Sequence, residues 1–162
     1  MPFCGECSTE MVERVPAGDD RPRLVCPSCG HIFYVNPKIV VGALPVIDGK
    51  VLLLRRGIEP RVGAWTCPGG FLEMGETPEE GALREAREEL GVEVGRLKLL
   101  GVYSRPSAGV VVVVYTASQV DGQPKAGSEA LEACFFGPEE IPWEELAFST
   151  TVNALKDWTR TI

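Results

Sequence analysis

The stretch from Gly70 to Val92, GFLEMGETPEEGALREAREELGV, carries the strongest signals of structure and chemistry in this chain. Its second half predicts a helix with both ends marked. Thr77 suits the N-cap, Pro78 suits the first helical position, and Glu80, three residues after the cap, completes a capping box. Gly91 suits the left-handed residue that follows a helix.

On such a helix Glu85, Glu88 and Glu89 fall at positions i, i+3 and i+4 and share one face. Like charges at this spacing repel each other, so the pattern favours a bound divalent cation, and carboxylate oxygens favour Mg²⁺ or Mn²⁺. The alternative is an acidic helix that only faces solvent. An apolar stripe argues against it, because it predicts that the helix packs on a core. The stripe consists of Ala82, Leu83, Ala86 and Leu90.

These residues resemble the signature of the Nudix hydrolase family, Gly-x5-Glu-x7-Arg-Glu-U-x-Glu-Glu-x-Gly-U, in which U is a bulky aliphatic residue. The matching positions are Gly70, Glu76, Arg84, Glu85, Glu88, Glu89, Gly91 and Val92. Ala86 is smaller than the usual aliphatic residue, and we expect a packing adjustment without loss of chemistry. The resemblance implies a Nudix α/β/α sandwich with a mixed sheet.

The resemblance also implies roles for residues around the three helical glutamates. Divalent ions on those glutamates would neutralise a diphosphate and lower the pKa of a bound water. Arg84 is expected to orient the carboxylates through a bidentate hydrogen bond. Glu76 is either an outer ligand or a loop clamp, and the Gly70 carbonyl is a candidate ligand. Glu129 matches a distal glutamate that acts as metal ligand or base on a mobile loop, although it could be an ordinary surface charge; Glu88 is the other candidate base.

Four of the six cysteines form two pairs near the start of the chain, Cys4-x2-Cys7 and Cys26-x2-Cys29, with 18 residues between the pairs. This spacing predicts a zinc ribbon in which four thiolates close the tetrahedron, so the zinc would be structural. A redox role for one pair is the alternative, which two pairs at ribbon spacing disfavour. We expect a zinc ribbon at residues 1–35 and a Nudix hydrolase domain at residues 36–162.

Strands are predicted for apolar runs at residues 39–47, 51–55, 92–102, 110–116 and 131–137. Asp48-Gly49 predicts a hairpin between the first two runs. The run at residues 110–116 is apolar throughout, which predicts a central strand. Residues 149–160 predict a closing helix capped by Ser149 or Thr150. Its inner stripe would be Val152, Leu155 and Trp158.

Composition and charge limit the kinds of partner that we expect for this chain. The chain has 162 residues and a net charge of −7, and neither this charge nor the slightly acidic balance over residues 1–38 suits a nucleic-acid partner. The chain has no apolar run long enough for a membrane span, and its first residues lack the pattern of a secretory signal, so we expect a cytoplasmic enzyme. The resemblance implies a small-molecule nucleotide substrate and a homodimer.

The order of ribbon, Asn36-Pro37 linker and box resembles the NADH pyrophosphatase branch of the family. Enzymes of that branch that prefer NADH carry Ser-Gln-Pro-Trp-Pro-Phe-Pro after the box, whereas residues 103–109 here read Tyr-Ser-Arg-Pro-Ser-Ala-Gly. Residues 146–149, Leu-Ala-Phe-Ser, resemble shorter ribbon-bearing relatives that act on ADP-ribose and FAD. The favoured function is therefore metal-dependent cleavage of the diphosphate bond of ADP-ribose, FAD or NADH to AMP plus a phosphorylated product.

Two other functions were weighed. A nucleoside triphosphate pyrophosphohydrolase of the sanitising type is disfavoured by the ribbon. A non-catalytic ligand sensor or nucleic-acid-binding module is disfavoured because every box carboxylate is present. Candidate substrate contacts are Arg55, Arg61, Trp65, Tyr103 and Phe148. Arg56 and Arg105 are further candidates for phosphate contacts, and every one of these side chains could instead belong to the core or the surface.

Overall fold

The computed structural model describes residues 2–161, and their contacts define two compact units with the boundary between Asn36 and Pro37. The N-terminal unit is a three-stranded antiparallel sheet with β2 in the centre. Its strands are β1 (Val12–Arg14), β2 (Arg23–Val25) and β3 (Ile32–Phe33). Cys4, Met11 and Cys26 form a small buried cluster within this unit.

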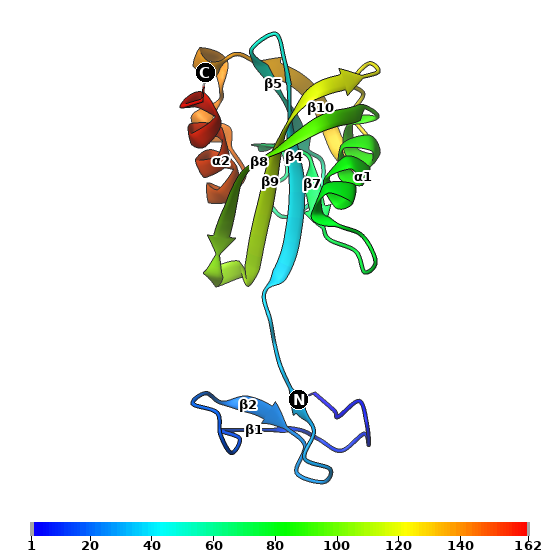
Figure 1. Ribbon diagram of the computed structural model, residues 1–162, viewed down its shortest axis with the longest axis vertical. Coiled ribbons are helices and arrows are strands. Elements are labelled where there is room, and N and C mark those ends of the chain that lie inside the picture. The colour runs from blue at the N-terminus through cyan, green and yellow to red at the C-terminus, as the bar shows by residue number, and fades with distance from the viewer. Residues whose placement is uncertain (1, 162) are drawn as a thin grey trace. The chain divides into compact units, whose positions relative to one another are not determined.

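The C-terminal unit is a mixed sheet with one helix on each face (Figure 1). Its strands are β4 (Lys38–Ile47), β5 (Lys50–Arg56), β6 (Trp65–Thr66), β7 (Gly69–Phe71), β8 (Glu93–Arg105), β9 (Val110–Asp121) and β10 (Ala130–Phe136). The order is β10-β5-β4-β9-β8, with β6 paired to β5 and β7 paired to β4. Only the β4–β9 pair is parallel among these strands. The expected α/β/α sandwich is confirmed.

Helix α1 (Pro78–Leu90) and helix α2 (Ser149–Thr159) cover two separate cores. Successive residues of β5 point to opposite faces of the sheet. Leu52 and Leu54 therefore pack in the core under α1, whereas Val51 and Leu53 pack in the core under α2. Both faces are covered, which explains why β5 is apolar without alternation. The remaining elements are the short 3₁₀ helices η1 (Pro106–Ala108), η2 (Pro138–Glu140) and η3 (Trp143–Glu145).

The hairpin between β4 and β5 has the predicted turn. Asp48 has φ 49° and Gly49 has φ 74°, as a two-residue type I′ turn requires. Strand β9 lies between β4 and β8, so it is central, as its apolar sequence predicts. The predicted cap of α2 is wrong. Phe148 occupies the N-cap without a side-chain hydrogen bond, because Ser149 already belongs to the helix.

The length and apolarity needed to cross a membrane are not found together in any helix of residues 2–161.

Candidate active site

The start of α1 is fixed by its capping box. The Thr77 hydroxyl accepts a hydrogen bond from the Glu80 amide at 3.2 Å, and the Glu80 carboxylate accepts one from the Thr77 amide at 2.7 Å. At the other end Gly91 is left-handed, with φ 65°. These two signals confirm the predicted helix limits, and they set which side chains of α1 face strand β7.

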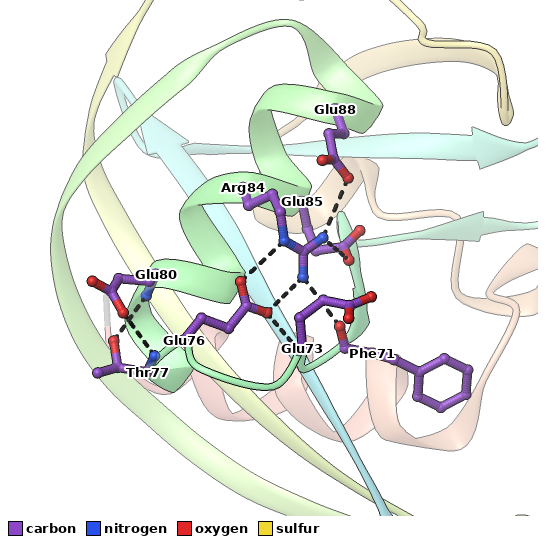
Figure 2. A network of polar contacts seen from close by, with 8 residues as sticks. All are labelled: Phe71, Glu73, Glu76, Thr77, Glu80, Arg84, Glu85 and Glu88. Carbon is purple, nitrogen blue, oxygen red and sulfur yellow. Dashed lines mark hydrogen bonds and ion pairs between the residues drawn. The ribbon is translucent and has the colours of Figure 1, made fainter.

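Arg84 is the centre of the polar network on α1 (Figure 2). Its Nε and Nη2 atoms donate to the two carboxylate oxygens of Glu76, at 3.1 and 2.7 Å. Its other hydrogen bonds go to Glu85 at 2.7 Å, to Glu88 at 3.2 Å and to the Phe71 carbonyl at 3.1 Å. The bidentate bond that the sequence predicts is thus made to Glu76, while Glu85 and Glu88 each receive a single bond.

Glu76 fastens the loop that precedes α1. Besides Arg84, its carboxylate accepts a hydrogen bond from the backbone amide of Glu73 at 2.7 Å. Hydrogen bonds from Arg84 hold the pKa of Glu76 below its usual value. Of the two roles expected for Glu76, this geometry favours the loop clamp.

Glu85 lies against a glycine that has no room for a side chain. A Cβ atom on Gly70 would stand 2.6 Å from the carboxyl carbon of Glu85. The Glu85 side chain is 12% exposed. Burial raises the pKa of Glu85, whereas its hydrogen bond with Arg84 lowers it. A side chain at position 70 would therefore displace the Glu85 carboxylate from the place it takes beside β7.

Glu89 is a half-buried acid of the site. Its carboxylate accepts a hydrogen bond from the Gly69 amide at 2.7 Å. The pKa of Glu89 is raised to about 7, chiefly by burial; the charges of Glu85 and Glu129 act in the same direction, and the hydrogen bond from Gly69 acts in the opposite one. This carboxylate is poorly solvated and has no cationic hydrogen-bond partner among the described residues.

A cavity of about 840 Å³ collects these groups. Its lining includes Gly70, Arg84, Glu85, Glu88, Glu89 and Glu129. Glu88 and Glu129 are exposed, whereas Glu85 is buried and Glu89 is half-buried, so these four carboxylates differ in their access to solvent. Carboxylate oxygens are hard donors of the kind that Mg²⁺ and Mn²⁺ prefer, and the donor set therefore fits such an ion.

Of the five candidate substrate contacts, all within the described chain, only Phe148 lines this cavity. Arg55 donates to the Gly63 carbonyl at 2.8 Å, and Arg61 lies on an exposed turn. Neither arginine therefore faces the cavity.

The two other aromatic candidates belong to the core under α2. Trp65 is 6% exposed and packs edge to face on Phe136, with ring centroids 4.9 Å apart. Tyr103 is 9% exposed, and its hydroxyl donates to Asp157 at 3.0 Å. Neither ring is free to stack on a substrate in this arrangement.

Phe148 lies between two guanidinium groups. Arg56 lies 5.1 Å and Arg105 5.7 Å from the centre of its ring. Phe148 and Arg56 line both the large cavity and a neighbouring one of about 230 Å³, which Arg105 also lines. The remaining lining of the large cavity includes residues that the sequence analysis did not single out. Among them are Ile58, Glu59, Pro60, Glu73 and Ser128.

The four ribbon cysteines form a cluster with the donor atoms that a metal site needs. Their sulfur atoms lie within 4.8 Å of one another, and the closest pair, Cys7 and Cys26, is 3.4 Å apart. Tetrahedral zinc with Zn–S bonds of about 2.3 Å requires sulfur atoms about 3.8 Å apart. The cluster thus fits a structural zinc ion, with Cys4 and Cys26 buried and Cys7 and Cys29 exposed.

Comparisons with known proteins agree with this geometry. Residues 36–157 match the NUDIX domain, and residues 2–35 match the zinc ribbon described as Nudix N-terminal. A crystal structure of a NUDIX hydrolase from Nitrosomonas europaea is 42% identical, with a TM-score of 0.92 over 99% of this chain and 91% of that one.

Curated relatives include an ADP-ribose pyrophosphatase of Methanocaldococcus jannaschii, which is 38% identical over 79% of this chain and 76% of its own. The NAD-capped RNA hydrolase NudC of Deinococcus radiodurans is 34% identical over 99% of this chain. The chain spans only 57% of that protein, and about half of the matching protein from Pseudomonas aeruginosa (49%). A domain match over most of the chain and an intact carboxylate box lead to one conclusion: this chain belongs to the Nudix hydrolase family and carries the family's N-terminal zinc ribbon.

Proposed function

We propose that this Nudix hydrolase uses a divalent metal to cleave the diphosphate bond of nucleoside diphosphate derivatives, with ADP-ribose as the favoured substrate. FAD and NADH are the related candidates. The observation that carries the proposal is one cavity lined by four carboxylates together with a guanidinium and an aromatic ring. The lining residues concerned are Glu85, Glu88, Glu89, Glu129, Arg56 and Phe148. Carboxylates for a cation thus stand in one cavity with a guanidinium and an aromatic ring for the substrate.

The residues that would hold Mg²⁺ or Mn²⁺ are Glu85, Glu88, Glu89, Glu129 and the carbonyl of Gly70. A divalent ion bound there supplies charge neutralisation of the diphosphate and a lowered pKa of the attacking water. The chain's own contribution is orientation: Arg84 fixes two of these carboxylates, and the Gly69 amide fixes a third. The proton of the attacking water would pass to Glu88 or Glu129, which are both exposed in the cavity.

Two features support the choice of substrate. Arg56 lines the cavity, where hydrogen bonds from its Nε to the Pro60 carbonyl at 2.8 Å and from its Nη2 to the Glu59 carbonyl at 3.4 Å hold its guanidinium, and its Nη1 can pair with the diphosphate. The Phe148 ring can stack on a base or flavin. The relative whose own length is well covered by this chain is named as an ADP-ribose pyrophosphatase, whereas the NAD-capped RNA hydrolases are about twice as long as the shared part. Residues 103–109 also lack the element that marks preference for NADH. We therefore propose ADP-ribose as the preferred substrate.

A panel of ADP-ribose, FAD, NADH, dGTP and coenzyme A, each with Mg²⁺ or Mn²⁺, tests the proposal when the products are resolved by chromatography. ADP-ribose should give AMP and ribose 5-phosphate, and FAD should give AMP and FMN. Inorganic phosphate should not appear, because no phosphomonoester is broken. Pyrophosphate released from dGTP faster than AMP from ADP-ribose would shift the assignment to the sanitising type. Binding without turnover would indicate a ligand sensor.

We also propose that the enzyme is a homodimer, as the resemblance implies, and that it acts in the cytoplasm. Light scattering of the purified protein should then give about twice the chain mass of 17.5 kDa. A mass of one chain at micromolar concentration would contradict the dimer.

A further inference from the structure

We propose that Gly127 and Gly57 are positioning residues that dock the Glu129 segment onto the catalytic helix. In this arrangement Glu129 is a fixed member of the site and not the end of a free loop. The inference rests on the proposed catalytic or metal-binding role of Glu129, and it adds the residues through which that role is achieved.

The first observation is how helix α1 ends. The last four carbonyls of a helix have no partner within it. Here the Arg87 carbonyl accepts the Gly91 amide at 2.9 Å, which is an ordinary helix cap. Two of the other three carbonyls are satisfied by a segment more than thirty residues away. The Glu89 carbonyl accepts the Gly127 amide at 2.9 Å, and the Leu90 carbonyl accepts the Lys125 amide at 2.8 Å.

The second observation is the space at Gly127. A Cβ atom on this residue would stand 2.5 Å from the Glu88 carbonyl oxygen and 3.2 Å from that of Glu89. Gly127 is not among the glycines with positive φ. Its lack of a side chain is therefore required by contact with the helix backbone and not by its own conformation.

The third observation is a hydrogen bond that holds the Glu129 segment at the end of β5. The Gly57 amide, just after β5, donates to the Glu129 carbonyl at 2.7 Å. A Cβ atom on Gly57 would stand 3.1 Å from that same oxygen. The backbone on either side of the Glu129 side chain is thus held by α1 through Gly127 and by the end of β5 through Gly57.

These contacts couple the loop to the catalytic glutamates. Glu88 and Glu89 use their carbonyls to receive the loop, while their side chains line the cavity that Glu129 enters. A methyl group at position 127 would move the loop away from the helix and take Glu129 with it. Displacing a catalytic group by about 1 Å can reduce turnover on the order of 100-fold.

A double-mutant cycle in the full chain tests the inference. The variants are Gly127→Ala, Glu129→Gln and the pair, with kcat for ADP-ribose measured at saturating Mn²⁺. Gly127→Ala should lower kcat by about 10- to 100-fold. In the Glu129→Gln background the same change should have no further effect, because Gly127 acts through Glu129. An equal loss in both backgrounds, or no loss in the first, would overturn the inference.

Gly95→Ala is the matched control, since a Cβ atom there meets nothing closer than 3.4 Å and the residue lies in β8, outside the cavity lining. It should leave kcat unchanged. If Gly127→Ala does not fold, Gly57→Ala replaces it in the same cycle.

Amide hydrogen exchange of the wild-type chain separates failure of this inference from failure of the proposed function. The Lys125, Gly127 and Gly57 amides should be protected even if no substrate of the panel is hydrolysed. Exchange of these three amides at the rate of an open loop would refute the docking, whatever the enzyme hydrolyses.

Discussion

At the scale of single residues, one guanidinium organises most of the charge on α1. Arg84 contacts three carboxylates and one backbone carbonyl, and its side chain is 26% exposed. A lysine cannot reproduce this arrangement, because its single ammonium group lacks the planar fork that spans both oxygens of Glu76. The orientation of Glu85 and Glu88 therefore depends on arginine itself.

Arg84→Lys should lower metal-dependent turnover by about 10- to 100-fold, the usual effect of losing a residue that orients metal ligands. Steady-state kinetics at increasing Mn²⁺ concentrations measures the loss. Arg87→Lys is the control, because its pair with Glu93 is more than half exposed and contributes little. Equal activity of both variants would contradict the role given to Arg84.

The two cysteines outside the ribbon should differ in reactivity. Burial raises the pKa of the Cys67 thiol to about 11, and the nearby Glu89 charge adds to the shift, whereas Cys134 is exposed. Iodoacetamide at pH 8 should modify Cys134 and leave Cys67 intact, as mass spectrometry of peptides would show. Because the folded pKa lies above the unfolded value of about 8.5, the fold favours the neutral thiol. This contribution to stability is complete below about pH 8.5 and is lost as the pH rises through 11. Modification of Cys67 first would contradict its burial.

At the scale of elements, helix α1 and the β4–β5 hairpin follow directly from local sequence. Thr77, Glu80 and Gly91 form the caps that their types predict, and Asp48-Gly49 forms the predicted turn. The prediction from local sequence was wrong where tertiary contacts determine the structure. The extended Phe148 takes the N-cap of α2 in place of a serine or threonine, with its ring between two arginines. Strands β6 and β7 are too short to show a period.

Substitutions at Thr77 and Ser149 distinguish a residue that caps its helix from one that was only predicted to do so. Thr77→Ala removes the hydroxyl that accepts the Glu80 amide and should lower the free energy of unfolding by about 1 kcal/mol. The melting temperature should fall by about 2–4 °C. Ser149→Ala should leave it unchanged, since Ser149 is exposed and does not cap α2. Calorimetry that shows the reverse order would contradict the assigned helix starts.

In the site, too, some features follow from local sequence and others depend on tertiary contacts. Sequence spacing places Glu85, Glu88 and Glu89 on one face of α1, and the cavity contains all three. The opposite wall, apart from Glu129, could not be predicted, because pairing of β10 with β5 brings residues 58–60 and 128–129 to the same cavity. For the same reason the sequence did not distinguish Arg56, which lines the cavity, from Arg55, the next residue of the strand, whose side chain takes the opposite direction.

At the scale of the whole molecule, the chain joins two units with different sources of stability. The C-terminal unit has two hydrophobic cores, whereas the ribbon buries only a small cluster around Cys4, Met11 and Cys26. A unit with so little apolar burial depends on its metal for folding. We therefore expect the ribbon to unfold when zinc is lost, while the hydrolase unit stays folded.

Cys26→Ser should release zinc and unfold the ribbon, because it removes a buried ligand of the cluster. Metal analysis of the wild-type protein should give about one zinc per chain, and amide exchange should show residues 2–35 unprotected in the variant only. Wild-type protein that lacks zinc and is still folded over these residues would refute the structural zinc site.

The central claim is that the carboxylates of α1 carry out the hydrolysis, and one substitution tests it most directly. Glu89→Gln keeps the size of the side chain and an acceptor for the Gly69 amide, but it removes one negative charge from the cavity. A catalytic metal contributes several kcal/mol of transition-state stabilisation, so kcat for AMP release from ADP-ribose with Mn²⁺ should fall by about a thousandfold. The melting temperature should not decrease. Near-normal turnover by a folded Glu89→Gln enzyme would contradict the assignment of the site.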